Sequence, residues 1–503
     1  MTRYQMNSKH AGMALDRGVQ GVLGRPVPRI DGIAKVTGAA TYALEHPVGN
    51  LAYGVAVTAP VGKGRVTSID TAAARALPGV IDVIAGDGSL PRDTPVFGRP
   101  DAPLYDGTIG SYGEVVGIAI AESFEAARAG AMAVTVRCEA IPGRFDIRDG
   151  QDDALATPEG ALLPDTVVGD IETAMREAPV TLDVTYTTPT QVHAAMEPYG
   201  SIASWDGDRL TLRAPVQLVT GGIAIIARSL GIRPEDIRIL SPFIGGGFGG
   251  KETQMNLFCC VAAIAAKKWH RAVKLRPDRD DDMIATGKRH DFVTDYSVGF
   301  DDEGRILAVT GDWYARCGFS ADLSMAVTDR ALFHADNAYF YPDVEVRSHP
   351  LRTNTVSNTA FRGFGGPQGV IVAERIIEEI AYATGQDTLA VRKANFYTDG
   401  QLTPYHQPVE NVILPQLIGE LEGSCDYAAR RRAVLDWNAR ADASGGVIRR
   451  GIALTPVKFG ISFTATHFNQ AGALVHIYTD GSIMLNHGGC EMGQGLHTKI
   501  VQV

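Results

Sequence analysis

Hydrophobic and polar positions alternate with two different periods over residues 24–142, which predicts a small α/β unit. Residues 113–121 (GEVVGIAIA) form a nearly continuous apolar run, typical of a buried strand. Residues 123–134 (SFEAARAGAMAV) have the spacing of an amphipathic helix, with Ser123 in the N-cap position. Residues 135–141 (TVRCEAI) return to a strand pattern. Strands and helices are therefore expected to alternate in this part of the chain.

A second, larger region of strand patterns begins near residue 167. Strands are predicted at residues 181–189, 208–215, 237–244 and 292–315, and helices at residues 253–269 and 367–385. The last helix has Pro367 in its first turn and Gly385 at its end, which are favoured positions for these residue types. The stretch between residue 315 and residue 367 is predicted to be mostly loop.

A third region begins after about residue 405. Residues 472–489 predict a β-hairpin with Asp480 and Gly481 at its turn. Residues 495–503 (GLHTKIVQV) predict the opening of a helix that has no C-cap. Because an apolar half-element has nothing of its own to pack against, we interpret the chain as a fragment, or as a chain that another polypeptide completes.

Together these patterns predict a mixed multidomain protein of α/β and α+β type. The chain has 503 residues, which is too long for a single hydrophobic core. The predicted divisions are a mobile tail, an α/β domain, a linker, a larger domain and the start of another: 1–20, 21–145, 146–165, 166–405 and 406–503.

Composition narrows the range of functions. The net charge of −10 and the pI of about 5.7 argue against a general nucleic-acid binder. The six cysteines are scattered without a C-x-x-C pair, which argues against zinc or iron–sulfur spacing and favours reduced thiols in the cytoplasm. The longest apolar run, residues 257–266, is half a membrane span, and the N-terminus shows no secretory signal.

Three glycine-rich loops precede predicted helices. They are GGGFGGKE at 245–252, AFRGFGGPQG at 360–369 and HGGCEMGQG at 487–495. The first matches G-x-G-x-x-G, but the acidic residue that a dinucleotide fold places about 20 positions later is missing. Backbone N–H groups at helix starts bind anions. The three loops are therefore compatible with convergence on one large anionic cofactor.

These loops and several other motifs resemble the molybdenum-binding part of xanthine dehydrogenase, within the molybdenum hydroxylase or xanthine oxidase family. The motifs are GGGFGGKE, TGKRHDF (286–292), DRALFHADNAY (329–339), NTAFRGFGGPQG (358–369), VKFGISFTATHFNQAGALVHIYTDGS (457–482) and HGGCEMGQGLHTKIVQV (487–503). Residues 24–43, 191–198 and 201–212 look more like the bacterial aldehyde oxidoreductases of the same superfamily. The resemblance implies a hammerhead domain at 21–145 and molybdopterin-binding domains at 166–405 and 406–503, the second one incomplete.

The resemblance implies a molybdenum–molybdopterin cofactor that the protein holds without ligating the metal directly. Water then supplies the oxygen of a hydroxylation, and two electrons leave through other cofactors. Because this chain shows no iron–sulfur or flavin signature, [2Fe–2S] clusters and FAD are expected on partner subunits of a hetero-oligomer. Two points stay open: whether the pterin bears a cytosine dinucleotide, and whether NAD or O₂ is the final acceptor.

Carried over position by position, the resemblance implies two sets of site residues. Gln217, Phe248 and Arg362 would lie near the molybdenum without being ligands. The cofactor-binding set is Gln217, Gly247, Phe248, Gly249, Arg362, Gly363, Met492, Gly493 and Gln494. The substrate-binding set is Glu252, Arg330, Phe364, Phe463 and Thr464.

In the substrate set, Glu252 would hydrogen-bond the substrate ring and Arg330 would neutralise negative charge that develops on a purine oxygen. Phe364 and Phe463 would lie on either side of a flat heteroaromatic ring. Simpler interpretations stand beside these roles. The two phenylalanines could be core residues, Arg330 could pair locally with Asp329, and the charge of Glu252 could serve the dipole of the following helix.

The combination of Glu252 and Arg330 favours a purine substrate, oxidised from hypoxanthine to xanthine to urate. The alternatives are an aldehyde oxidoreductase that forms carboxylic acids, and an inactive cofactor-free fragment or scaffold. In the family, the general base is a glutamate that lies beyond the position of Val503, so no catalytic residue is assigned in this chain. Loss of a general base costs about 10²–10⁴-fold in rate, and this chain alone is predicted to be inactive.

Overall fold

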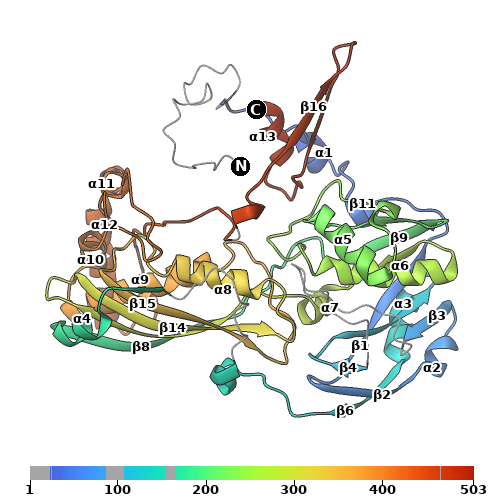
Figure 1. Ribbon diagram of the computed structural model, residues 1–503, viewed down its shortest axis with the longest axis horizontal. Coiled ribbons are helices and arrows are strands. Elements are labelled where there is room, and N and C mark those ends of the chain that lie inside the picture. Colours follow the sequence, from blue (N-terminus) through green and yellow to red (C-terminus); the bar gives the residue numbers. More distant parts are fainter. Residues whose placement is uncertain (1–22, 24, 86–106, 154–165, 465) are drawn as a thin grey trace.

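The computed structural model describes residues 23, 25–85, 107–153, 166–464 and 466–503 (Figure 1). The predicted N-terminal tail at 1–20 and most of the predicted linker at 146–165 lie outside the described residues. Within them, the chain forms two sheet-based lobes and a projecting hairpin (Figure 1).

The first lobe is built on a seven-stranded sheet that combines strands from two separate parts of the chain. Its order is β11 (Ile237–Leu240), β10 (Arg209–Arg213), β9 (Ser201–Asp206), β12 (Val273–Leu275), β1 (Ala52–Thr58), β5 (Val115–Ala121) and β3 (Val80–Ala85). Strand β1 pairs in parallel with β12, with Ala52 opposite Val273. This pairing joins the predicted domains at 21–145 and 166–405 in one sheet, and their boundaries stay a prediction.

Apolar helices cover this sheet and form the first core. Helix α6 (Met255–Trp269) packs on β9 and β12 beside α5 (Val219–Leu230), and α3 (Phe124–Ala133) packs on β1 and β5. Cys259 and Cys260 of α6 are fully buried in this core. A smaller sheet next to it has the order β4 (Thr108–Ile109), β2 (Gly64–Asp70) and β6 (Thr135–Ala140). The remaining elements here are α1 (Gly32–Val36), η2 (Ala43–Glu45), α2 (Ala72–Arg75), η3 (Ile147–Asp153), η4 (Pro234–Asp236) and α7 (Arg279–Ala285).

The second lobe is built on a five-stranded sheet with its own core. Its order is β7 (Thr166–Val168), β15 (Asp343–Arg352), β14 (Ile306–Gly318), β13 (Phe292–Phe300) and β8 (Val180–Thr188). Helices α8 (Ser324–Phe333) and α9 (Gly366–Thr384) pack against each other and against this sheet. Helices α4 (Ile171–Glu177), α10 (Thr388–Ala394), α11 (Leu414–Ser424) and α12 (Tyr427–Ala443) complete the lobe.

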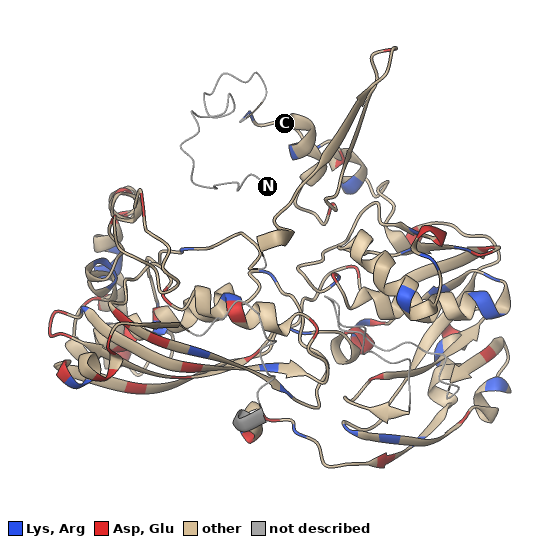
Figure 2. Ribbon diagram, in the orientation of Figure 1, with Lys and Arg blue, Asp and Glu red and all other residues tan. Residues whose placement is uncertain are grey.

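The C-terminal elements project from the region between the lobes (Figure 1). They are η5 (Thr466–Phe468), β16 (Ala473–Ile477), β17 (Ile483–His487) and α13 (Leu496–Gln502). The two strands form a hairpin that carries very few charged side chains (Figure 2). Its apolar side chains are exposed, with Leu474 at 59% and Ile477 at 68%. Helix α1 lies beside α13 (Figure 1), and the backbone N–H of Ile30 donates to Thr498.

Most sequence-predicted elements are confirmed. The strand and helix around residue 123 correspond to β5 and α3, and the side chain of Ser123 accepts a hydrogen bond from the N–H of Ala126. The other predicted strands and helices match β6, β8, β10, β13, β14, α6, α9 and α13. The predicted hairpin has Gly481 at its turn with a φ of 83°, a value that glycine adopts readily.

Two predictions of secondary structure are wrong. The strand expected over 237–244 ends at Leu240, because Pro242 lacks the N–H that a strand pairing needs. The stretch expected to be mostly loop contains α8 and the ten-residue strand β15. Pro350 lies inside β15 but beyond the three residues that pair with β7, so its missing N–H costs no hydrogen bond on that side.

Candidate functional site

The first glycine loop, residues 245–251, adopts backbone angles that favour residues without a side chain. Gly246 and Gly249 have φ values of 94° and 99°, and Phe248 between them has a φ of 54°. A Cβ on Gly249 would lie 2.7 Å from the backbone of Ala360, closer than atoms approach. The glycines are therefore needed both for conformation and for contact with the second loop.

The side chain of Gln217 hydrogen-bonds to two N–H groups of this loop. Its Oε1 accepts hydrogen bonds of 3.1 Å from the N–H groups of Gly249 and of Lys251. These two bonds identify the carbonyl side of the amide, so the Nε2 side points away from the loop. This Nε2 donates to no described residue and is available to a ligand.

Three consecutive N–H groups of the loop also have no acceptor within the described structure. They belong to Gly246, Gly247 and Phe248. The side chain of Phe248 is 44% exposed, so this part of the loop faces solvent. Bare backbone donors beside an amide donor form a surface suited to a polar or anionic group.

The second glycine loop packs directly on the first. His193 Nε2 donates a hydrogen bond of 2.6 Å to the carbonyl oxygen of Ala360, and burial lowers the pKa of His193 to about 4. Arg289 donates to the carbonyl oxygen of Arg362 at 2.8 Å, and its guanidinium lies 3.9 Å from the ring centre of Phe361. The guanidinium of Arg362 is exposed and hydrogen-bonds to no described residue. It is therefore free to contact an anion.

The third glycine loop is joined to the first by a main-chain contact. The N–H of Ile244 donates to the carbonyl oxygen of Glu491 at 3.1 Å. Within the loop, Glu491 Oε1 accepts hydrogen bonds from the N–H groups of Gly493 and Gly495. Gln494 folds back on the loop, accepting from the N–H of Met492 at 2.6 Å and donating to Cys490 at 2.9 Å. Several donors of this loop are thus occupied internally.

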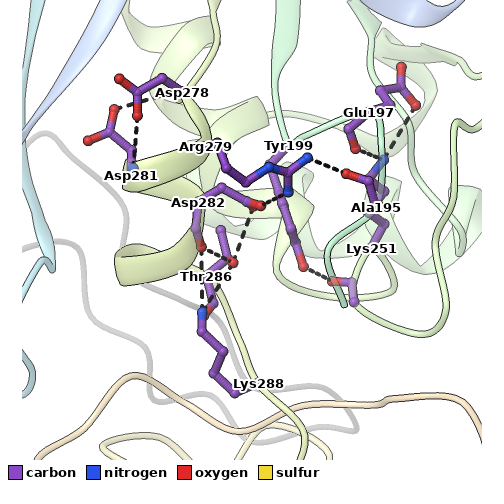
Figure 3. A network of polar contacts seen from close by, with 11 residues as sticks. Ala195, Glu197, Tyr199, Lys251, Asp278, Arg279, Asp281, Asp282, Thr286 and Lys288 are labelled. Atoms are coloured by element: carbon purple, nitrogen blue, oxygen red, sulfur yellow. Dashed lines mark hydrogen bonds and ion pairs between the residues drawn. The ribbon is translucent and has the colours of Figure 1, made fainter. Parts of the chain in front are cut away.

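A buried network of polar contacts joins the first loop to residues 197–199 (Figure 3). Lys251 is fully buried and donates to the carbonyl oxygen of Glu197 at 2.7 Å. The carboxylate of Glu197 accepts from the N–H of Gly245 at 2.7 Å. Tyr199 donates to the carbonyl oxygen of Gly250 at 2.6 Å. The two ends of the glycine loop are therefore tied to residues 197–199.

Glu252 follows the loop and is only partly exposed. The pKa of Glu252 is raised to about 7. Burial is the larger cause, and the negative charge of Asp322 is the smaller one. No described residue hydrogen-bonds to its carboxyl group. A pKa of about 7 leaves roughly half of Glu252 protonated at neutral pH, and the protonated form can donate a hydrogen bond.

Arg330 lies on α8 and is buried, with 5% of its surface exposed. Its two Nη atoms donate to the carbonyl oxygens of Gly460 and Ser462, and burial lowers its pKa. It forms no ion pair with any described residue. The guanidinium lies 5.8 Å from the ring centre of Phe364.

Phe364 and Phe463 lie against each other beside Arg330. Their ring centres are 5.6 Å apart, and the ring planes are tilted by 48°. A flat ring between them would require two contact distances of about 3.5 Å each, so roughly 7 Å in total. The two rings would therefore have to separate to enclose a flat ligand. Both are partly exposed and outside the two main cores, as is Thr464.

Comparison with known proteins identifies the family. Molybdopterin cofactor-binding domain models match residues 156–396 and 420–503, and the aldehyde oxidase and xanthine dehydrogenase a/b hammerhead domain matches residues 37–142. The chain belongs to the aldehyde oxidase and xanthine dehydrogenase family of molybdenum hydroxylases. The predicted resemblance and the predicted mixed fold with a hammerhead domain are confirmed.

Individual relatives support the same family. The chain is 36% identical over 487 residues to a xanthine dehydrogenase/oxidase of Felis catus, covering 96% of this chain and 36% of the relative. It is 37% identical over 488 residues to a xanthine dehydrogenase of Dictyostelium discoideum, covering 95% and 35%. The chain therefore spans about a third of the length of these curated relatives. In fold it is similar to the aldehyde oxidoreductase from Desulfovibrio desulfuricans ATCC 27774, with a TM-score of 0.78, 24% identity, and coverage of 92% of this chain and 52% of that one.

The donor set of the first two loops fits the molybdopterin cofactor of this family. The N–H groups of residues 246–248, the amide of Gln217 and the guanidinium of Arg362 are donors without partners among the described residues, and all suit an oxygen-rich, negatively charged group. The third loop is adjacent, but the N–H groups of Gly489, Met492, Gly493 and Gly495 already have acceptors within the loop. No group of three or more His, Cys, Asp or Glu in the described structure could hold a metal ion.

The residues that hold the loops in place are not among the site residues predicted from the sequence. They are Arg29, His193, Glu197, Asp322 and Glu491. His193 and Glu197 lie in the motif at 191–198, one of the segments that resemble bacterial aldehyde oxidoreductases. No helix in the described part of the chain is both long enough and apolar enough to cross a membrane.

Proposed function

We propose that this chain is the molybdopterin-binding part of an enzyme that hydroxylates purines, converting hypoxanthine to xanthine and xanthine to urate. The observation that carries the proposal is a buried cation, without an acidic partner in the described structure, beside one pair of aromatic rings, together with a carboxyl group of raised pKa on the segment that is bonded to the start of the cation's helix. These groups are Glu252, Arg330, Phe364 and Phe463. An aldehyde needs neither an acid nor a cation on its far side.

The acid and the cation are linked through helix α8. The side chains of Thr253 and Gln254, which directly follow Glu252, hydrogen-bond to Asp322 just before α8. Arg330 lies six residues after Ser324, the first residue of α8, which is about 9 Å along the helix axis. Glu252 therefore faces the start of the helix that carries the cation. This arrangement supports a substrate that reaches from one polar group to the other.

Each substrate residue has a defined task in the proposed reaction. Glu252 in its protonated form donates a hydrogen bond to a ring nitrogen or oxygen of the purine. Arg330 stabilises negative charge that develops on the purine oxygen as the ring carbon is hydroxylated. Phe364, Phe463 and Thr464 orient the flat ring. Arg330 has to exchange one or both carbonyl acceptors at Gly460 and Ser462 for the substrate oxygen.

The bound molybdenum–molybdopterin group would supply the activated oxygen from water and accept two electrons. Gln217 Nε2, the N–H groups of Gly247 and Phe248, and the close approach at Gly249 would position its polar atoms. Arg362 and Gly363 would contact it from the second loop. Met492, Gly493 and Gln494 would join from the third loop once Gln494 turns its amide outward. The cytosine dinucleotide form of the pterin is part of this proposal and is left to be tested.

We propose that electrons leave this chain through [2Fe–2S] clusters and FAD carried by partner subunits or by further parts of a longer protein. The general base is expected outside residues 1–503. The free thiols of the chain support a reducing, cytoplasmic location. Isolation of the native complex, followed by iron and flavin analysis, tests these assignments.

The substitution Arg330→Met in the complete enzyme tests the substrate assignment. We expect kcat/KM for xanthine to fall about 10²–10³-fold, the usual cost of removing a group that stabilises developing charge. Turnover of an aromatic aldehyde should change less than about tenfold, because its hydroxylation does not place charge near Arg330. Equal losses on both substrates would refute the purine assignment. The exposed Arg176→Met serves as a control and should affect neither.

One observation favours the second candidate, an aldehyde oxidoreductase. Both Nη atoms of Arg330 are bound to backbone carbonyls, so the cation does not face an open site as it stands. The same two-substrate assay of the unmodified enzyme decides between the candidates, since aldehyde preference would leave xanthine turnover near background. The third candidate, a cofactor-free scaffold, predicts no molybdenum in purified protein.

A further inference from the structure

Asp322 lies at the junction between the segment of Glu252 and the helix of Arg330. Its Oδ2 accepts a hydrogen bond of 3.1 Å from Thr253 Oγ1 and another of 3.1 Å from Gln254 Nε2. Thr253 and Gln254 are themselves buried, at 5% and 4% exposure. One carboxylate thus ties two successive residues after Glu252 to the chain two residues before α8.

The backbone at Asp322 is adapted to this position. Its φ is 40°, in the left-handed region that only a few residue types enter readily. Aspartate and asparagine tolerate this region better than other residues with a side chain. The contact therefore combines an unusual backbone angle with two hydrogen bonds, and it fixes where α8 begins relative to Glu252.

Asp322 is also the charged residue that acts on Glu252. Its negative charge adds to burial in raising the pKa of Glu252 to about 7. Neighbouring cations are directed elsewhere in the described structure. Lys251 donates to Glu197, Lys288 donates to the carbonyl oxygen of Thr286, and Arg330 donates to carbonyl oxygens of residues 460 and 462.

We propose that Asp322 is a positioning residue of the substrate site: it holds the Glu252 segment against helix α8 and, by its negative charge, keeps Glu252 in the neutral form that donates a hydrogen bond to the substrate. The role of Glu252 toward a purine rests on the proposed function. The effect of Asp322 on Glu252 is a property of the protein alone. The two parts can therefore be tested separately.

Asp322→Asn separates the charge from the hydrogen bonds. Asparagine keeps an acceptor oxygen for Thr253 and Gln254 and tolerates the left-handed backbone, but it removes the negative charge. The effect on Glu252 is read without any ligand. The stability difference between a protein and its Glu252→Gln variant is measured by thermal unfolding from pH 4.5 to pH 9, with and without Asp322→Asn. This difference follows the titration of Glu252.

In the parent protein the stability difference should change with pH up to about 7, the pKa of Glu252. With Asp322→Asn, the pH at which the stability difference stops changing should be lower. It should lie between about 7 and 4.5, the ordinary pKa of a glutamate side chain. Glu303→Gln, which removes an exposed and distant negative charge, should leave it in place. An unchanged position in Asp322→Asn overturns the proposal, as does an equal shift in the Glu303→Gln control.

The second measurement uses the complete enzyme and urate, the final product of the proposed reaction. Urate affinity, measured by equilibrium dialysis, should fall as the pH rises through 7, because deprotonated Glu252 cannot donate. In Asp322→Asn this fall should begin at a lower pH. If the unmodified enzyme fails to bind urate at any pH, the purine proposal fails while the ligand-free titration still decides the role of Asp322. Urate binding whose pH dependence is identical in the two proteins contradicts the positioning role.

Discussion

Lys251 Nζ lies 2.7 Å from the carbonyl oxygen of Glu197 and 3.4 Å from the carboxylate of the same residue. The side chains are 1% and 11% exposed, so this is an ion pair in the interior. The same carboxylate accepts from the N–H of Gly245. Glu197 thus binds both the first residue and the last residue of the glycine loop, and Figure 3 shows its contact with Lys251.

Lys251→Met should destabilise the protein strongly. Removing the cation leaves the carboxylate of Glu197 buried without its charged partner, and breaking such a pair costs about 3–5 kcal/mol. Chemical denaturation of purified protein checks this. Lys267→Met is a matched control, because Lys267 pairs with Asp208 at the surface, where such pairs contribute about 0–1 kcal/mol. Similar costs for the two substitutions would contradict the role assigned to Lys251.

Glu252→Gln should stabilise the protein at alkaline pH and have little effect in acid. The folded-state pKa of Glu252 is about 7, above the 4.5 of the unfolded chain. The folded protein therefore binds this proton more tightly, and stability is lost as the pH rises from 4.5 through 7. Glutamine is neutral at every pH and avoids a loss of roughly 3 kcal/mol at pH 8. Melting temperatures at pH 4.5 and pH 8 provide the measurement. A gain of the same size at both pH values would contradict the raised pKa.

The sequence was informative where one element carries a strong local signal. Helix α6 is apolar on nearly every side, and the alternating pattern of β14 matches its alternation of buried and partly buried side chains. Helix α8 escaped prediction because its ten residues mix apolar and polar side chains without a clear period. The parallel pairing of β1 with β12 joins residues more than 200 positions apart, and local patterning cannot specify such a partner.

The candidate site was also predictable only in part. Glycine clusters and the resemblance pointed to the three loops, and the contacts of Gly249 with Ala360 and of Ile244 with Glu491 place these loops side by side. The individual roles given to Gln494, Phe364 and Phe463 remain predictions. Side-chain orientation depends on neighbours that are distant in sequence, as the hydrogen bonds between Gln494 and its own loop illustrate. Asp322 has no local motif, because its importance comes only from contact with residues 253 and 254.

Gly249→Ala should abolish the approach of the first two loops. Its φ is 99° and an added Cβ would meet the backbone of Ala360 at 2.7 Å, so strain and overlap act together. Gly231→Ala is the control, with a φ of 65° and open space around the added carbon. We expect about 1–2 kcal/mol of destabilisation for Gly231→Ala from the backbone angle alone. Gly249→Ala should cost more and should also lower the molybdenum content of the complete enzyme. Equal stability and full molybdenum content would show that the close contact is dispensable.

Acid should loosen the third glycine loop from the body of the protein. Burial raises the pKa of Glu491, but hydrogen bonds from the N–H groups of Gly493, Gly495 and His497, with the charge of Arg29, outweigh it and lower the pKa below 4.5. A lowered pKa means that the stabilising contribution is present above 4.5 and is lost as the pH falls through the folded-state value.

Glu491→Gln should reproduce this effect at neutral pH. The variant loses the ion pair of 3.0 Å with Arg29 and half of the acceptors for the loop N–H groups. Amide hydrogen exchange at Gly493 and Gly495, measured by mass spectrometry of the covering peptide, should become at least tenfold faster, corresponding to about 1.4 kcal/mol of lost local protection. Glu177→Gln, an exposed substitution in α4, should leave this peptide unchanged. Unaltered exchange in Glu491→Gln would mean that the hydrogen bond from Ile244 to the main chain of residue 491 is sufficient to hold the loop.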